Sequence, residues 1–312
     1  MSANHTPAFP IALGGAAVGS CPEKVFFEGP VSEQQAVNTV LQALEEGINL
    51  VDTSPFYGDS ETKIGKALAE WGKRESVIVS TKAGSHPQHK GYSSEHFFHS
   101  IDNSLTRLKT DYLDIVHIHD PSSSDFKTVM GKKGGLEVLL RYKEQGIIRH
   151  IGLGVRSHEL HREFISSGFA DVILPYLDYN LMSTSAADLL LFAMENKVNV
   201  MMGSPLCMGY LSGKNPYKYK VSHFDISSEF PLRKAMLMYD WCLRRNVNLL
   251  NLNLKFILQH PAITTIVAGA VSPVEVSALI AHYYEPVSDA ILNSFMEEFD
   301  LKKPNIEIKN KP

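Results

Sequence analysis

The segment Gly47–Leu68, GINLVDTSPFYGDSETKIGKAL, joins a short apolar run to an amphipathic stretch through a polar turn. The apolar run ends at Asp52, and Tyr57 follows five residues later. A short β-branched run followed by a segment of helical period is typical of one βα unit of a parallel sheet. The segment therefore predicts a strand that delivers polar side chains to its C-terminal end.

The same alternation of short apolar runs and helical stretches recurs along the whole chain. Most of the short runs are apolar throughout, as expected for parallel strands that are buried on both faces. Eight strands with helices between them in 312 residues favour an α/β fold, a (β/α)8 TIM barrel, over an open sheet. We expect one domain over residues 1–312. The expected strands are Phe9–Gly14, Asn49–Asp52, Val77–Thr81, Asp114–His119, His150–Gly154, Asp171–Tyr176, Val198–Met202 and Thr264–Ala268.

Helical stretches separate these strands. Ser32 is expected to cap the first of them, with Gln35 three residues on and Gly47 as its stop. Segments 85–96 and 213–231 are longer than a βα link needs, and they follow the third and seventh strands, where barrel enzymes place their sites. The expected helices include Ser32–Glu46, Leu136–Glu144, Leu189–Glu195 and Leu249–Gln259.

The composition argues against a nucleic-acid-binding or membrane protein. Hydrophobic residues make up 44% and charged residues 21% of the chain, with a net charge of -4. This charge gives no basic surface for nucleic acid and no polybasic segment for an anionic membrane. No leader-like start and no run of about 18 apolar residues is present, so we expect a cytoplasmic protein without a membrane span.

The cysteine pattern points to a reducing compartment. Cys21, Cys207 and Cys242 are far apart in the sequence, odd in number and outside any CxxC pattern. Such spacing argues against a disulfide framework and against a structural zinc site. We therefore expect each cysteine to be a small buried apolar residue.

Four polar residues gather at the predicted C-terminal ends of neighbouring strands. Asp52 ends the second strand, Lys82 follows the third, and His119 ends the fourth. Tyr57 lies on the loop after Asp52. The parallel strands of a barrel end on one rim, so all four side chains should project into the same mouth.

These residue types suit a proton transfer that accompanies the transfer of a hydride. The pKa of an unperturbed tyrosine is about 10, and a lysine ammonium close to the Tyr57 phenol is expected to lower it. Asp52 would keep Lys82 charged and oriented, and His119 could bind the substrate oxygen or relay the proton. No side chain accepts a hydride, so this chemistry requires a cofactor.

Other interpretations of the same residues stay open. Taken singly, Asp52 could cap the helix that follows it, and Lys82 could be a solvated surface charge. Tyr57 and His119 could simply pack. His117 and His119 lie two residues apart on one strand, so both could ligate the metal of a hydrolase. No matching His or Asp ends the fifth, sixth or eighth strand, and we expect no metal site.

The segments that hold these residues resemble the landmark blocks of the aldo-keto reductase superfamily, in the same order and at the same spacing. They are GINLVDTSPFYGDSETKIGKAL at 47–68, VIVSTKAG at 77–84 and DYLDIVHIHDP at 111–121. The later blocks IRHIGLGV, SPLCMGYLSGK and HPAITTIVAGA fit as well, so the resemblance spans about residues 8–299. It implies a barrel that is a monomer or a weak homo-oligomer. It also implies a catalytic tetrad, which falls on Asp52, Tyr57, Lys82 and His119.

The resemblance further implies a nicotinamide cofactor, NAD or NADP. Three places that hold the nicotinamide in many relatives differ here: Gly154-Val155 replaces Ser-Asn, Tyr176 replaces Gln, and Gly203 replaces an aromatic residue. The backbone amides of residues 204–209 could still cradle the pyrophosphate. The expected cofactor contacts are Gly15, Tyr176, Ser204, Pro205, Leu206, Met208, Gly209, Gly269, Ala270 and Glu275.

The segment expected to bind the adenosine end favours NAD. Residues 268–281 hold no Lys or Arg to pair with a 2′-phosphate, whereas Glu275 suits a free ribose 2′-hydroxyl. A cation that reached this place from another loop would favour NADP instead. The candidates for such a cation are Lys214, Lys218 and Lys220.

YLDYNL at 176–181 and GLGV at 152–155 are similar to the sugar-oxidising branch of the superfamily, the L-galactose dehydrogenases and the D-threo-aldose (L-fucose) 1-dehydrogenases. This resemblance implies oxidation of a small free aldose to its lactone. An NADPH-dependent reductase of small aldehydes or ketones would use the same tetrad. A non-catalytic nicotinamide-binding barrel that regulates a partner is the alternative of another class.

Overall fold

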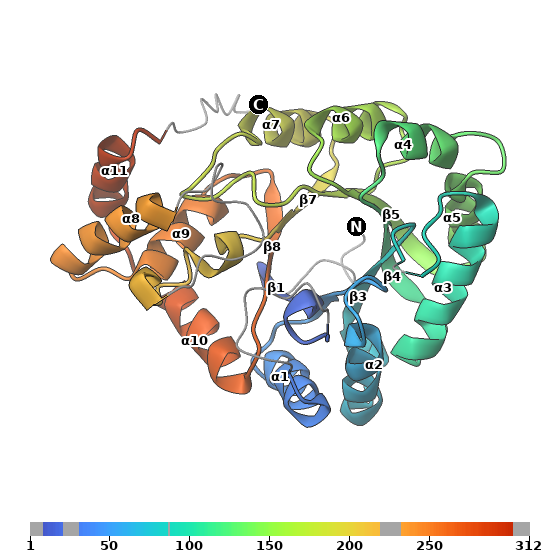
Figure 1. Ribbon diagram of the computed structural model, residues 1–312, viewed down its shortest axis with the longest axis horizontal. Helices are drawn as coiled ribbons and strands as arrows, with labels where there is room; N and C mark the ends of the chain where they lie inside the picture. The colour runs from blue at the N-terminus through green and yellow to red at the C-terminus, as the bar shows by residue number, and fades with distance from the viewer. Residues whose placement is uncertain (1–8, 21–30, 87, 219–231, 302–312) are drawn as a thin grey trace, which may run out of the picture.

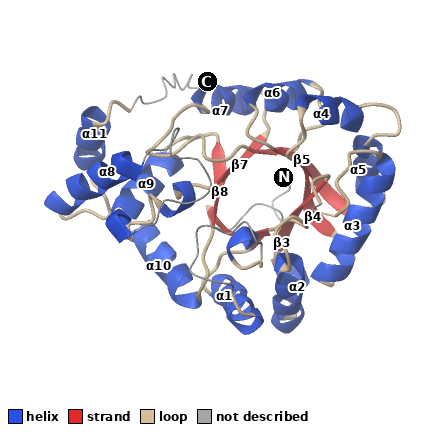
Figure 2. Cartoon of the chain, in the orientation of Figure 1, coloured by secondary structure: helices blue, strands red, loops and turns tan. Residues whose placement is uncertain are grey.

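The computed structural model describes residues 9–20, 31–86, 88–218 and 232–301. Its eight parallel strands close into a barrel in which β1 to β8 follow one another in sequence order. Figure 1 shows the strands as a central ring surrounded by helices, and Figure 2 separates the red ring from the blue helices outside it. The (β/α)8 TIM barrel expected from the sequence is confirmed.

All eight strands lie where the alternation places them, with ends that differ by a few residues. The strands are β1 Ile11–Gly14, β2 Leu50–Asp52, β3 Ile78–Ala83, β4 Leu113–His119, β5 Ile148–Gly154, β6 Val172–Leu174, β7 Asn199–Gly203 and β8 Ile263–Ala268. The helices are α1 Glu33–Glu45, α2 Ser60–Trp71, α3 Ser94–Leu108, α4 Ser123–Met130, α5 Gly135–Glu144, α6 His158–Ser166, α7 Ala187–Glu195, α8 Leu232–Arg244, α9 Leu249–Leu258, α10 Pro273–Tyr284 and α11 Asp289–Glu298. Short 3-10 turns lie at η2 Gly15–Ala17, η3 Arg74–Ser76, η4 Cys207–Gly209 and η5 Pro216–Lys218.

Local sequence explains where these elements begin and end. The Ser32 hydroxyl accepts a hydrogen bond from the Gln35 amide at 3.2 Å and so caps α1, as predicted. Gly47 follows α1 with a φ of +93°, the left-handed backbone that glycine adopts without strain. β6 is shorter than the predicted Asp171–Tyr176, because Pro175 has no amide to donate to a neighbouring strand.

Apolar side chains fill two layers, one inside the ring of strands and one between the strands and the helices. Cys207 and Cys242 are buried, as expected, and form no disulfide within the described residues, whereas Cys21 lies outside them. No helix in the described ranges is long and apolar enough to cross a membrane. The interior of the ring is lined by Ala12, Leu50, Ile78, Ile115, Val172, Leu174, Met201 and Val267.

The strand register sets the height of each side chain in the barrel. Asp52 on β2 pairs with Gly14 on β1, at the C-terminal end of both strands. Lys82 on β3 pairs with His117 on β4, and His119 pairs with Gly154 on β5. Asp52, Lys82 and His119 therefore lie near one rim.

Gly152 and Gly154 on β5 offer a matched test of how tightly the barrel interior is filled. A methyl group on Gly152 would fall on the Nδ1 atom of the buried His117 ring, whereas one on Gly154 would meet its nearest atom at 3.8 Å. We expect Gly152→Ala to lower the free energy of unfolding by about 1–3 kcal/mol, the usual effect of overpacking, and Gly154→Ala to change it far less. Urea denaturation followed by circular dichroism measures both. Equal effects would show that the His117 ring does not fill the space beside Gly152.

Candidate active site

A cavity of about 650 Å³ opens at the C-terminal rim of the barrel. Asp52, Tyr57, Lys82 and His119 all line it, so the structure brings the four predicted residues together. The lining continues through the ends of β6, β7 and β8 to α10. This volume lies within the range of roughly 300–1,000 Å³ found for small-molecule sites.

A buried ion pair forms the floor of the cavity. The Lys82 Nζ atom lies 2.6 Å from Asp52 Oδ2, and the two side chains are only 2% and 5% exposed. Lys82 also donates to the Thr53 carbonyl at 2.7 Å, and the Ser80 hydroxyl donates to Asp52 Oδ1 at 2.7 Å. Asp52 therefore pairs with Lys82 and accepts a hydrogen bond from Ser80, and it does not cap a helix.

The charge of Asp52 decides the protonation of Lys82. Burial alone would lower the pKa of the Lys82 ammonium, because it removes the charge from water. The charges and hydrogen bonds of Asp52 and Tyr57, with Asp52 contributing most, together outweigh this effect and raise the pKa of Lys82 above its ordinary value. Lys82 is thus a permanent cation in the floor of the cavity, rather than the surface charge of the alternative interpretation.

Tyr57 stands over this ion pair. Its ring centroid lies 5.0 Å from the Lys82 Nζ atom and 6.0 Å from the His119 ring. Burial raises the pKa of the Tyr57 phenol above its ordinary value, and the Lys82 charge opposes that rise. The expectation of a net lowered pKa is therefore wrong, because burial outweighs the lysine that was correctly placed beside the phenol.

His119 is tethered by two serines that the sequence analysis did not single out. Its Nδ1 atom lies 3.2 Å from the Ser54 hydroxyl and also hydrogen-bonds the Ser85 hydroxyl. Burial, together with the Lys82 charge, holds the pKa of His119 well below its ordinary value, so the ring is neutral. Ser54 and Ser85 follow the ends of β2 and β3, and this position at the rim was the signal that could have found them.

His117 does not line the cavity. It is fully buried within the ring of strands, and neither ring nitrogen has a hydrogen-bond partner among the described residues. Burial, with the nearby Lys82 charge, holds its pKa well below the ordinary value. No group of three or more His, Cys, Asp or Glu residues in the described part of the chain is placed to hold a metal ion. The geometry thus offers no support for the metal-hydrolase alternative.

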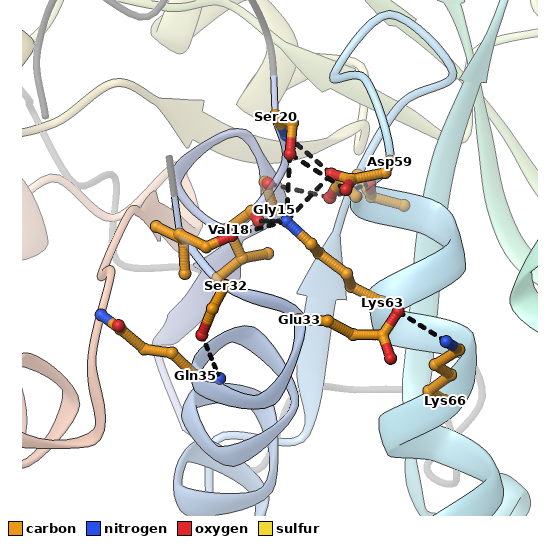
Figure 3. A network of polar contacts seen from close by, with 12 residues as sticks. Gly15, Val18, Ser20, Ser32, Glu33, Gln35, Asp59, Lys63 and Lys66 are labelled. Atoms are coloured by element: carbon orange, nitrogen blue, oxygen red, sulfur yellow. Dashed lines mark hydrogen bonds and ion pairs between the residues drawn. The ribbon is translucent and has the colours of Figure 1, made fainter. Parts of the chain in front are cut away.

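A second buried lysine fixes the loop that borders Tyr57. The Lys63 Nζ atom of α2 donates to the Val18 carbonyl at 3.1 Å and to the Val31 carbonyl at 2.8 Å, and pairs with Asp59 at 3.0 Å. Figure 3 shows these contacts converging on Lys63, with Asp59 reaching across to Ser20. This network was not predicted, because it joins loops that are distant in sequence.

The loop held by Lys63 lies directly against the backbone of Tyr57. Gly19 passes so close to the Tyr57 carbonyl oxygen that a Cβ atom at this position would overlap it. Ser60, three residues after Tyr57, donates from its hydroxyl to the Gly15 carbonyl at 2.8 Å. The loop after β1 and the loop after β2 are therefore fitted to each other around Tyr57.

The predicted cofactor contacts line the same cavity, except for Gly15 and Ala270. Gly15 packs against Ser60 and Ala270 is buried in the core, so neither of these two lines the cavity, and their contact with a cofactor stays a prediction. The lining residues Ser204, Met208 and Gly209 have positive φ angles. Left-handed backbone of this kind can turn peptide N–H groups into a concave anion site, which fits a pyrophosphate.

One cation reaches Glu275 from another loop. The Lys214 Nζ atom lies 2.6 Å from Glu275 Oε1, although the lysine side chain is 64% exposed. Glu275 Oε2 accepts from the Val271 amide at 2.8 Å, which fixes the carboxylate at the start of α10. The site therefore presents a paired carboxylate. Within the described residues Lys218 forms no ion pair with Glu275, and Lys220 lies outside them.

The chain is similar to known proteins over most of its length. Residues 10–296 match the Aldo/keto reductase family. Over 279 residues the chain is 33% identical to L-galactose dehydrogenase from Arabidopsis thaliana, which covers 87% of this chain and 83% of that protein. It is 30% identical over 305 residues to the NADH-specific methylglyoxal reductase of Escherichia coli (strain K12), covering 90% of this chain and 91% of that one.

A solved structure shows the same fold at lower identity. The holo form of an aldo-keto reductase from Bacillus halodurans superposes with a TM-score of 0.76 at 22% identity, over 97% of this chain and 95% of that one. Family match, sequence identity and closed barrel all agree. The chain belongs to the aldo/keto reductase family.

Proposed function

We propose that this protein oxidises a free aldose at the anomeric carbon to the lactone, with Tyr57 as the general base. The observation that carries the proposal is the buried Lys82–Asp52 ion pair, which sets a permanent cation 5.0 Å from the Tyr57 ring. A cation in this place stabilises a phenolate more than a phenol. The similarity to L-galactose dehydrogenase, whose name describes the oxidation of a sugar, supports an aldose as the substrate.

In this proposal each residue of the tetrad has one task. The anomeric hydroxyl loses its proton to the Tyr57 phenolate, while the C1–H bond breaks and the lactone C1=O bond forms. A nicotinamide cofactor, when bound, supplies the acceptor for the hydride. Lys82 stabilises the phenolate, and Asp52 keeps Lys82 protonated. His119 is neutral and held at Nδ1 by serine hydroxyls, so its Nε2–H can donate to the substrate oxygen.

The far part of the cavity suits the cofactor. The backbone amides of Ser204, Leu206 and Met208 would hold the pyrophosphate, because Pro205 has no amide hydrogen and the Cys207 and Gly209 amides already donate within the loop. Gly269 allows close approach beside β8. Tyr176 lies between the tetrad and this loop and offers an aromatic face for the nicotinamide ring. Glu275 would accept a hydrogen bond from a ribose 2′-hydroxyl, which supports a preference for NAD.

A reductase of small aldehydes or ketones that uses NADPH is the second candidate function. The observation that favours it is the Lys214–Glu275 ion pair, because the lysine neutralises a carboxylate that would otherwise repel a 2′-phosphate. Lys214 is one of the three lysines that were expected to favour NADP if they reached this place from another loop.

Purified protein incubated with NAD or NADP and with L-fucose, L-galactose or D-arabinose should produce reduced nicotinamide, detected by its absorbance. Tyr57→Phe should lower the turnover number for the oxidised sugar by at least about a hundredfold, the scale of general acid–base catalysis, with little change in cofactor affinity. Tyr112→Phe is the matched control, because Tyr112 directly precedes β4 and so lies at the end of that strand away from the cavity. Consumption of NADPH with simple aldehydes, and no oxidation of any sugar, would favour the reductase. Near wild-type turnover in Tyr57→Phe would remove Tyr57 from its role.

The rate of sugar oxidation should rise with pH. Burial raises the pKa of Tyr57, so only a small fraction of the phenol is ionised at neutral pH. Below that pKa the phenolate fraction grows tenfold per pH unit, so log kcat/KM for oxidation should climb with a slope near +1 through the neutral and mildly alkaline range. Reduction, in which the neutral phenol donates the proton, should be flat over the same range. An acid optimum for oxidation would contradict the assigned base.

Two substitutions at the adenosine end should move cofactor preference in opposite directions. Glu275→Gln removes the carboxylate but keeps its shape, and it should raise the ratio of kcat/KM for NADP over NAD by at least about tenfold. Lys214→Met leaves Glu275 unpaired and should lower the same ratio. Steady-state kinetics with both cofactors measures it. Shifts in the same direction would show that the Lys214–Glu275 pair does not distinguish the 2′-hydroxyl of NAD from the 2′-phosphate of NADP.

A further inference from the structure

Asp120 is a charged side chain at the mouth of the cavity that the tetrad does not use. It directly follows His119 and lines the cavity together with Tyr57 and Tyr176. Its side chain is 40% exposed, and its charge acts on the Tyr57 phenol. A carboxylate in this place faces whatever occupies the space next to the reacting oxygen.

The backbone is shaped to hold the Asp120 carboxylate there. Asp120 has a φ of +42°, a left-handed conformation that, apart from glycine, mainly Asn and Asp adopt. Its amide donates to the Gly154 carbonyl at 2.9 Å, and its carbonyl accepts from the buried Tyr92 hydroxyl at 3.0 Å. Backbone in this unfavourable region persists where the surroundings enforce it, and such positions cluster at functional sites.

The carboxylate has few partners for its charge. Oδ1 accepts from the Tyr176 hydroxyl at 3.0 Å, and Oδ2 lies 3.5 Å from Nε2 of the neutral His119 ring. No Lys or Arg within the described ranges forms an ion pair with Asp120. Burial raises the pKa of Asp120, as expected for an underpartnered charge. The two oxygens of a carboxylate can accept about four hydrogen bonds. Asp120 accepts one from Tyr176 and lines the cavity, so its remaining acceptor positions are open to a ligand there.

We infer that the Asp120 carboxylate, beside Tyr176 and His119, binds hydroxyl groups of the substrate next to the reacting carbon and so selects polyhydroxylated substrates. Hydroxyl donors satisfy a carboxylate without a counter-charge and form short, charge-assisted hydrogen bonds. A substrate without neighbouring hydroxyls would leave the charge desolvated, and a substrate with its own carboxylate would be repelled. This inference deepens the proposed function, on which it rests for the position of the reacting oxygen at Tyr57.

The test compares two aldehydes that differ in hydroxyl groups only. Glyceraldehyde and propanal are reduced with NADH or NADPH, and the ratio of their kcat/KM values is measured for wild type and for Asp120→Asn. Asparagine keeps the shape and tolerates left-handed backbone, but it lacks the charge. We expect the ratio to fall by at least about tenfold, the scale of one lost charge-assisted hydrogen bond. A ratio cancels any general effect of the substitution on the chemical step.

Asp111→Asn, an exposed carboxylate just before β4 and so at the opposite end of the strand from the cavity, is the matched control and should leave the ratio unchanged. A wild-type ratio in Asp120→Asn would overturn the inference. Failure of wild type to oxidise any aldose would count against the proposed function alone, because the aldehyde ratio is measured in the reductive direction.

A second measurement does not require turnover. Titration calorimetry with the sugar alcohol arabinitol should show binding to wild type and binding at least about tenfold weaker to Asp120→Asn. Equal affinities, or no binding to wild type, would overturn the inference even in a protein that reduces neither aldehyde.

Discussion

The ion pair between Lys82 and Asp52 is the constraint on which the site depends. Both side chains are almost fully buried, so removing either would strand a charge inside the barrel, a change that is strongly destabilising. The pair forms where the neighbouring parallel strands β2 and β3 end on one rim. It places the Lys82 ammonium 5.0 Å from the centroid of the Tyr57 ring. The arrangement of the strands thus fixes the distances between the polar groups of the cavity.

The sequence predicted what depends on local periodicity and on strand ends. The eight strands follow from apolar runs, four helices follow from amphipathic stretches, and Asp52, Lys82 and His119 follow from the ends of three runs. Tyr57 follows from its place on the loop five residues after Asp52. What it could not predict depends on the path of loops: the tethering of His119 by Ser54 and Ser85, the Lys63 network, and the meeting of Lys214 with Glu275. The sign of the Tyr57 pKa shift was missed because burial, which is a property of the assembled cavity, outweighs the neighbouring lysine.

Carboxylates and their partners distinguish the two ends of the cavity. At the far end Glu275 is paired with an exposed lysine, and its charge is partly neutralised. Among the described residues, Asp120 at the mouth contacts the Tyr176 hydroxyl and the neutral His119 ring and pairs with no Lys or Arg. The same functional group thus lines one cavity in two electrostatic states, one partly neutralised and one with no cationic side chain bonded to it among the described residues.

The contacts of Lys63 determine which part of the connection between β1 and α1 can change in length and sequence. One ammonium group holds the carbonyls of Val18 and Val31 and the side chain of Ser20, so both anchors of the connection between β1 and α1 are fastened to α2. The Tyr57 backbone is braced by the same fastening through Gly19. Segments of other lengths and compositions could therefore be grafted between the two anchors while the Tyr57 backbone keeps its place.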